Sequence, residues 1–277
     1  MQTQIVRKTC KAVDAYPQTW KELISDWGKD SEEDAVWLTY AANYLFRTAG
    51  VHWGLDPFSL SSRIGKSPQP NFRQDLAPLK LIVLSHHHND HFDPILLTEL
   101  QCLPITWVIP KFILESVKLI CNLPDSRIII PEPGVPLVFD ELVLTPFNAL
   151  HFHGNYGVPE MGYLAEFSGK RWLFTGDTRS FEAKGLPEFG ALDGVMAHCW
   201  LGKDSALEPK KEFIGAFCKL FGSFNSKKIV ISHLQEYGRS PDNFWTLEHF
   251  RMLKRGFIEM DPKPQVVKAL LGDKILL

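Results

Sequence analysis

Four of the ten histidines in this 277-residue chain fall within the six residues HHHNDH, which run from His86 to His91. Imidazole nitrogens and carboxylate oxygens are the donors that divalent transition metals prefer in catalytic sites. In an extended segment residues i and i+2 point the same way, so His86 and His88 can hold one ion. After the chain turns, Asp90 and His91 can face a second ion nearby. The segment therefore predicts a metal site.

The element before this segment can hold it rigidly. LKLIVLS, at residues 79–85, is a continuous apolar run with polar neighbours, which is typical of a strand buried on both faces. Ligands at the end of such a strand have the fixed base that a preorganised site requires. His87 and Asn89 alternate away from the ligand positions, so we interpret them as supporting or structural residues.

The remaining pattern mixes strands and helices. PQTWKELISDWG at 17–28 predicts a short amphipathic helix with Pro17 in its first turn. Hairpins are predicted with turns at Gly50, at Asp140–Glu141, at Gly169–Lys170 and at Gly272–Asp273. Helices are expected at 110–120, at about 208–221, with Cys218 on the core face, and at about 242–255. Strand hairpins interleaved with helices favour sheets packed face to face with helices outside.

HHHNDH resembles the HxHxDH motif of the metallo-β-lactamase superfamily. The resemblance extends over 36–277, because ALHFHG, LFTGDT and VISHLQ follow in the family's order and supply His151, Asp177 and His233. It implies a four-layer αβ/βα sandwich of the α+β class in a hydrolase domain at 35–277; the segment at 1–34 lies outside the resemblance and is predicted to be a helical extension. LDPF resembles the family's early hairpin, in which Asp56 commonly lies near the metal loop. The A-x-H form of the third motif resembles the branch of ascorbate-phosphate lactonases and N-acyl-phosphatidylethanolamine phospholipases D.

The resemblance also implies a role for each ligand. His86, His88 and His151 would hold the first metal ion, Asp90, His91 and His233 the second, and Asp177 would bridge both. A shared carboxylate offsets the repulsion between two neighbouring cations. Two divalent ions, zinc or manganese, are the expected cofactors. The residues predicted to take a direct part in catalysis are Asp90, His151 and Asp177.

Four other histidines are judged from their positions. His153 can face the same way as His151, and only the family pattern favours His151 as the ligand. His198, at the end of GVMAHCW, fits either a substrate contact or a structural role at a strand end. His52 and His249 are expected to be structural.

Such a site predicts a hydrolase. Two ions lower the pKa of a bound water, and the metal-bound hydroxide can attack an ester-type bond in a phosphodiester, a lactone or a related ester. No GxSxG elbow, Walker A loop or GxGxxG sequence offers a competing mechanism. The alternative is an iron-dependent, dioxygenase-like oxidoreductase on the same fold. In that branch a Glu is typical at the second motif position, where this chain has His88.

Composition limits the partners. The net charge of -2 favours neither nucleic acid nor an anionic membrane, and no apolar run approaches the roughly 20 residues of a membrane span. The N-terminus lacks the pattern of a secretory signal. Five widely spaced cysteines without a CxxC pair favour reduced thiols and a cytoplasmic location. The expected partner is a small-molecule or lipid-like ester substrate, not a nucleic acid.

Overall fold

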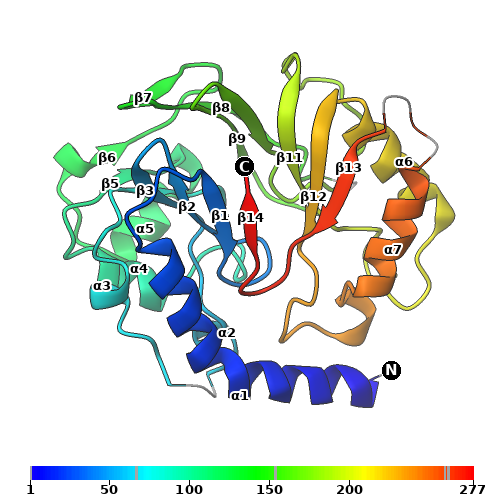
Figure 1. Cartoon of the computed structure of the whole chain (residues 1–277), viewed down its shortest axis with the longest axis horizontal. Coiled ribbons are helices and arrows are strands. Elements are labelled where there is room, and N and C mark those ends of the chain that lie inside the picture. The colour runs from blue at the N-terminus through cyan, green and yellow to red at the C-terminus, as the bar shows by residue number, and fades with distance from the viewer. Residues whose placement is uncertain (1, 66–67, 153–154, 259, 261–262) are drawn as a thin grey trace. The chain divides into compact units, whose positions relative to one another are not determined.

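The computed structural model of the chain describes residues 2–65, 68–152, 155–258, 260 and 263–277 (Figure 1). Two compact units make up the chain. The first unit contains Met1–Pro131 and Leu271–Leu276, and the second contains Glu132–Leu270 with Leu277. In the part of the chain that the structure describes, each unit contains one seven-stranded sheet. The predicted boundary between an extension at 1–34 and a hydrolase domain at 35–277 stays a prediction.

The sheet of the first unit has the strand order β14-β1-β2-β3-β4-β5-β6. Its strands are β1 (Ala35–Leu38), β2 (Tyr44–Thr48), β3 (Val51–Leu55), β4 (Leu81–Val83), β5 (Thr106–Val108), β6 (Ile128–Ile129) and β14 (Lys274–Leu276). β1, β2 and β3 pair antiparallel, and β3 to β6 pair parallel. The predicted hairpin turn at Gly50 is confirmed, since Gly50 has φ 72°. β4 is fully buried, as its apolar run predicts.

The helices of the first unit are mostly short. They are α1 (Gln2–Trp27), α2 (Leu60–Ile64), α3 (Phe72–Asp75), α4 (Pro94–Leu100) and α5 (Leu114–Ile120), with 3-10 turns at Lys111–Ile113 and Asp125–Arg127. The prediction that a helix begins at Pro17 is wrong, because Pro17 lies inside α1. Figure 1 shows this helix bent part-way along. A proline inside a helix removes one backbone hydrogen bond and kinks the helix without necessarily ending it.

The second half of α1 is anchored to the first unit. Trp20 and Trp27 are buried, and their indole nitrogens donate to Asp75 Oδ2 at 2.9 Å and to the Phe46 carbonyl at 2.9 Å. Arg47 of β2 donates to the carbonyl oxygens of Asp26, Trp27 and Lys29 at the helix end. These carbonyls would otherwise lack intrahelical partners, so Arg47 caps the helix.

The sheet of the second unit has the strand order β13-β12-β11-β10-β9-β8-β7. Its strands are β7 (Leu137–Phe139), β8 (Leu142–Asn148), β9 (Met161–Phe167), β10 (Lys170–Phe174), β11 (Leu192–His198), β12 (Ser226–Ser232) and β13 (Gln265–Lys268). β7 to β10 pair antiparallel, and β10 to β13 pair parallel. The hairpin turn between β7 and β8 is confirmed. The turn between β9 and β10 lies one residue earlier than predicted, at Ser168–Gly169, where both residues have positive φ.

Within its described residues the second unit has two helices, α6 (Lys211–Gly222) and α7 (Leu247–Gly256), and a 3-10 turn at Pro241–Asn243 precedes α7. Both predicted helices are confirmed with shifted ends. Cys218 is buried in the core cluster among Phe217, Phe221 and Leu253, which confirms its predicted core position. Burial raises the pKa of its thiol to about 12, so Cys218 is a thiol and not a nucleophile at neutral pH.

The predicted terminal hairpin at Gly272–Asp273 is wrong. β13 pairs parallel with β12, whereas β14 pairs antiparallel with β1, so the two strands belong to different sheets. Figure 1 shows β13 beside β12 and β14 beside β1. Gly272 does turn the chain, with φ 84°. Each strand satisfies its backbone hydrogen bonds on the edge of an existing sheet, where a whole row of partners is available.

Among the described residues, no helix is long and apolar enough to cross a membrane. The five cysteines are free thiols, of which Cys121, Cys199 and Cys218 are buried. The predicted cytoplasmic location stays a prediction.

Candidate metal centre

The loop after β4 carries four of the predicted ligands in the first unit. Exposure alternates along it: His86 is fully buried, His88 is half-buried and Asp90 is buried, whereas His87 and Asn89 are more exposed than the residues on either side of them. The ring centroids of His86 and His88 lie 4.8 Å apart, and those of His86 and His91 lie 4.3 Å apart. The i, i+2 spacing therefore brings the predicted ligands of this loop together and leaves the two intervening residues outside the cluster.

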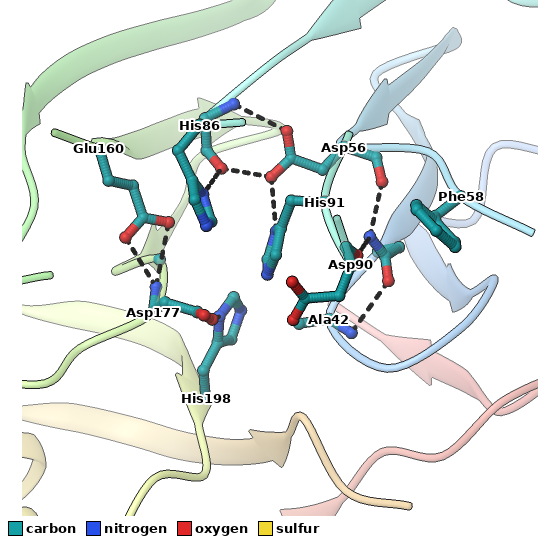
Figure 2. Close-up of polar contacts among 12 residues, drawn as sticks. Ala42, Asp56, Phe58, His86, Asp90, His91, Glu160, Asp177 and His198 are labelled. Carbon is teal, nitrogen blue, oxygen red and sulfur yellow. Dashed lines mark hydrogen bonds and ion pairs between the residues drawn. The ribbon is translucent and has the colours of Figure 1, made fainter. Parts of the chain in front are cut away.

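Asp56 fixes two of these rings (Figure 2). Its Oδ2 accepts from His91 Nδ1 at 2.9 Å and also contacts Ser85 Oγ, while its Oδ1 accepts from the Ser85 backbone N–H at 2.7 Å. Ser85 Oγ in turn lies 2.8 Å from His86 Nδ1. With Ser85 donating its hydroxyl hydrogen to Asp56, both rings carry their proton on Nδ1. Nε2 is then the atom through which each ring would coordinate a metal.

The expectation that Asp56 lies near the metal loop is confirmed by these contacts. Possible metal-binding atoms of Asp56, His86 and His91 lie within 4.8 Å of one another, so Asp56 is close to the histidine loop within the first unit. The sequence interpretation missed Ser85, although it directly precedes the histidine segment. A serine at the end of a strand carries no local signal that distinguishes this role from a turn residue.

Asn43 joins the hairpin to the histidine loop. Its side-chain N–H groups donate to the Asp56 carbonyl and to the Asp90 carbonyl, both at 2.9 Å. The loop then turns back on itself, since the backbone N–H of His91 donates to the His88 carbonyl at 2.9 Å. Asp93 caps α4 by accepting from the N–H groups of Ile95 and Leu96. These bonds hold the backbone of the loop at both ends.

His151 and Asp177 meet in the second unit. His151 Nδ1 lies 3.0 Å from the Val158 carbonyl and 3.4 Å from the Val158 backbone nitrogen; the shorter contact is to an acceptor and assigns the proton to Nδ1. Its Nε2 lies 3.9 Å from Asp177 Oδ2. Two ligand atoms on one tetrahedral zinc ion lie about 3.4 Å apart, given metal–ligand distances of about 2.1 Å. The observed separation therefore suits two donors on one ion after a small adjustment.

Asp177 is positioned by its own turn after β10. Gly176 has φ 70°, and the Asp177 backbone N–H donates to both carboxylate oxygens of Glu160 at 3.0 and 2.9 Å. Its Oδ1 accepts from His198 Nδ1 at 3.0 Å. Figure 2 shows Glu160 and His198 approaching Asp177 from the backbone side and the carboxylate side. His198 thus contacts a predicted ligand directly, which the sequence interpretation left open.

Glu160 was missed from the sequence. It is a buried carboxylate, 3% exposed, directly before β9, and its Oε2 also lies 3.8 Å from His151 Nδ1. Its partners, His151 and Asp177, are separated from it by nine and seventeen residues along the chain. An acidic residue before a strand is common, so only the tertiary contacts reveal its role.

His233 follows β12 with φ 59° and is buried. Its Nδ1 lies 3.4 Å from the Cys199 carbonyl, its Nε2 lies 3.3 Å from Glu236 Oε2, and its ring stacks on His198 at 6.0 Å. The second unit therefore gathers His151, Asp177 and His233 with His198 and the two buried glutamates. His153 lies outside the described residues.

The two histidines expected to be structural are confirmed as such. His52 Nε2 lies 3.0 Å from the Trp27 carbonyl, and its ring packs edge-on against Trp27. His249 caps α7, where its Nδ1 accepts from the Thr246 N–H at 2.8 Å and its Nε2 donates to the Ala206 carbonyl at 2.9 Å.

A family model described as the β-lactamase superfamily domain matches residues 54–223. The chain belongs to this superfamily. The match includes the histidine loop, His151 and Asp177, while His233 lies beyond it. A search of curated protein sequences gives no significant match.

Solved structures with the metallo-β-lactamase fold confirm the predicted fold class. Igni18, a metallo hydrolase from the archaeon Ignicoccus hospitalis, is 16% identical, with TM-score 0.63 over 88% of this chain and 98% of that chain. YhfI from Bacillus subtilis is 17% identical, with TM-score 0.58 over 87% and 99%. CmlA, a diiron β-hydroxylase from Streptomyces venezuelae, is 13% identical, with TM-score 0.62 over 90% and 55%. At these identities the likenesses establish the fold alone.

The donor chemistry of this superfamily member fits divalent metal ions. Each cluster combines imidazole nitrogens with carboxylate oxygens, which suits zinc, manganese or iron. Nδ1 of His86 is hydrogen-bonded to the Ser85 hydroxyl, and Nδ1 of His91 to the Asp56 carboxylate. Nδ1 of His151 is hydrogen-bonded to a backbone carbonyl. Such bonds are typical of metal-ligating histidines, because they fix the ring and its tautomer.

Proposed function

We propose that this protein is a metal-dependent hydrolase that cleaves an ester-type bond, with two divalent ions held by the predicted ligands. The observation that carries the proposal is the Nδ1 bonding of His86, His91 and His151, which presents Nε2 of each ring as a donor. Membership of the superfamily supports it independently.

The proposed ligand set keeps the roles implied by the family motifs. His86, His88 and His151 would hold one ion, and Asp90, His91 and His233 the other. Asp177 would be shared. Of its two oxygens, Oδ2 lies 3.9 Å from His151 Nε2, while Oδ1 accepts a hydrogen bond from His198, which orients the carboxylate.

When bound, the ions would activate a water molecule and polarise the substrate oxygen. The residues of this chain prepare that chemistry. Asp56 and Ser85 hold two imidazole rings with Nε2 as the donor atom, and the Asp56 carboxylate fixes the orientation and tautomer of the His91 ring. Glu160 orients the Asp177 backbone, and His198 orients its carboxylate. Asp90, His151 and Asp177 are the proposed catalytic residues.

Redox chemistry is the second candidate. The fold is shared with CmlA, which is a diiron β-hydroxylase. The chain has His88 where the diiron branch typically has Glu, and this difference favours hydrolysis. We propose a small-molecule or lipid-like ester as substrate and no nucleic-acid partner.

Metal content of matched histidine variants tests the proposal. His86→Ala should lose bound metal, whereas His87→Ala, with an exposed side chain one residue away, should keep about two ions per chain. Elemental analysis of protein purified without chelator gives the stoichiometry, and circular dichroism checks folding. Full metal content in the folded His86→Ala protein would contradict the ligand set.

Labelled water separates hydrolysis from oxygen chemistry. A panel of phosphodiesters, lactones and related esters is assayed with zinc or manganese, and turnover is repeated in ¹⁸O-labelled water. Hydrolysis places solvent oxygen in the product and consumes no oxygen gas. Uptake of oxygen gas, with iron as the only activating metal, would favour the oxidoreductase.

A further inference from the structure

A cavity of about 150 Å³ in the second unit borders His233. Three cationic side chains line it, those of Arg179, Lys203 and Arg239. Such a concentration of positive charge does not follow from the composition, because the whole chain has a net charge of -2. Small cavities with a few convergent polar groups beside a reactive site are typical places for substrate recognition.

Arg179 has a buried N–H group that an anionic ligand could accept from. Its side chain is 17% exposed, and its Nη2 lies 3.9 Å from Asp177 Oδ2. Its Nε is buried and, within the part of the chain that the structure describes, has no hydrogen-bond partner. A buried N–H group of a guanidinium is costly to leave unsatisfied, and an anionic ligand would supply a charge-assisted bond.

The other two cations are held in place by neighbours. Lys203 Nζ lies 4.3 Å above the ring of Tyr156, another residue of the cavity. Arg239 Nε donates to Glu236 Oε1 at 2.6 Å. Glu236 also lines the cavity and offsets one positive charge. Among the described lining residues, three cationic side chains face one carboxylate, and this excess of positive charge favours an anion over a neutral or cationic group.

Apart from Asn243, the rest of the lining is aromatic. Trp200 and Trp245 line the cavity together with Tyr156. Arginine and lysine side chains that pack against aromatic rings can bind flat or compact anions, while the apolar part of the ligand contacts the rings. At about 150 Å³ the space suits a single small group and not a second ring system.

We propose that this cavity binds an anionic group of the substrate, a phosphate or a carboxylate, beside the bond that is cleaved. That the group belongs to a substrate rests on the proposed hydrolase function, whereas binding of an anion by Arg179 and Lys203 requires neither a metal ion nor hydrolysis. Lys203 and Arg179 supply the charge that selects the group. The substrate class is thereby narrowed to esters that carry a negative charge close to the scissile bond.

The first test uses inorganic phosphate and acetate as probes of the chelated, metal-free protein. Tryptophan fluorescence follows binding, because Trp200 and Trp245 line the cavity. Saturable quenching should occur and should weaken as the salt concentration rises. Stronger binding of phosphate identifies a phosphate site, and stronger binding of acetate identifies a carboxylate site. Absence of saturable binding of either anion would overturn the proposal.

Matched lysine variants locate the site. Lys203→Gln should weaken anion binding by about threefold to tenfold, and Arg179→Gln by about tenfold or more, since charge-assisted bonds to a less exposed group are stronger. Lys227→Gln is the control, because Lys227 is exposed and paired with Asp193 outside the cavity. Equal affinities in the Lys203 and Lys227 variants would contradict the assignment.

Kinetics separate this inference from the hydrolase function. Lys203→Gln should raise KM for an anionic ester by about threefold to tenfold, with little change in kcat or in the KM of a neutral analogue. Metal-dependent hydrolysis without anion binding would overturn the subsite and leave the function standing. Anion binding weakened by Lys203→Gln, in a protein without metal-dependent hydrolysis, would overturn the function and leave the subsite standing.

Discussion

Asp177 contacts three of the other residues gathered at the candidate metal site of the second unit. Its backbone N–H is held by Glu160, its Oδ1 by His198, and its Oδ2 lies 3.9 Å from His151 Nε2. Asp177→Asn keeps the shape and the acceptor for His198 but removes the negative charge. If Asp177 is shared by two ions, both lose attraction at once, and the variant should retain less than about one ion per chain.

His233→Ala is the comparison, since His233 is proposed to serve one ion. This variant should keep about one ion per chain and weak activity at best. Elemental analysis of both variants, with folding checked by circular dichroism, gives the stoichiometries. An Asp177→Asn protein that binds two ions tightly would show that another carboxylate is shared.

His249 makes stability depend on pH. Burial lowers the pKa of this imidazole, and the ring is held neutral because Nδ1 accepts from Thr246 while Nε2 donates to Ala206. The unfolded chain takes up its proton near about pH 6.5, and the folded chain only at lower pH. The stabilising contribution is therefore present above about pH 6.5 and is lost as pH falls from there through the folded pKa.

NMR titration of His249 should give a pKa below about 6.5. In denaturant unfolding, wild type should lose more stability than His249→Gln between about pH 7.5 and about pH 5.5, by about 1.4 kcal/mol for each unit of pKa depression. Parallel stability curves for the two proteins would contradict the assignment.

At the scale of elements, the turns that end strands decide where ligands point. Gly176 has φ 70°, and a Cβ there would meet the Glu160 carboxylate at Oε1. The Glu160 side chain can move away, but only by breaking its two bonds to the Asp177 N–H. Gly176→Ala should therefore displace Asp177, lower metal content and destabilise the protein by about 3 kcal/mol or more, from backbone strain and the lost bonds together.

Gly169→Ala is a matched control for this turn. Gly169 has φ 71°, and a Cβ there meets nothing within 4 Å. The control carries the same backbone strain, about 1–2 kcal/mol, without the collision. Its metal content should equal that of wild type. Equal metal loss in both variants would show that strain at either end of β10, and not the position of Glu160, controls Asp177.

At the scale of the whole molecule, the proposed ligands are far apart in sequence, from His86 to His233. Ions that bind only the folded chain stabilise it by mass action, by about 4 kcal/mol when their free concentration is about a thousand times Kd. Chelation should therefore lower the melting temperature of wild type by several degrees.

Calorimetry with and without chelator measures this shift. The His86→Ala protein should show a much smaller chelator effect than wild type, while His87→Ala should behave like wild type. A melting temperature of wild type that is unchanged after metal removal has been verified would contradict the metal sites.

The sequence by itself determined the histidine loop and most strands. The loop follows a run that hydrophobicity marks as a buried strand, and His86, His88 and Asp90 are less exposed than the residues between them, as predicted. These features are local: side-chain direction along an extended segment repeats every two residues, whatever the rest of the chain does. His151, Asp177 and His233 were identified from the family motifs that ALHFHG, LFTGDT and VISHLQ resemble.

Only the tertiary structure decided which residues hydrogen-bond to the predicted ligands and which strands pair. Asp56, Ser85 and Glu160 reach their histidine or backbone partners through contacts that have no fixed sequence spacing. β13 and β14 resemble a hairpin in their local sequence, yet each pairs with a distant strand, because sheet edges offer more hydrogen bonds than the short turn between them. α1 already begins at Gln2, before Pro17, where Ile5 and Tyr16 are buried, and their packing outweighs the local preference of proline.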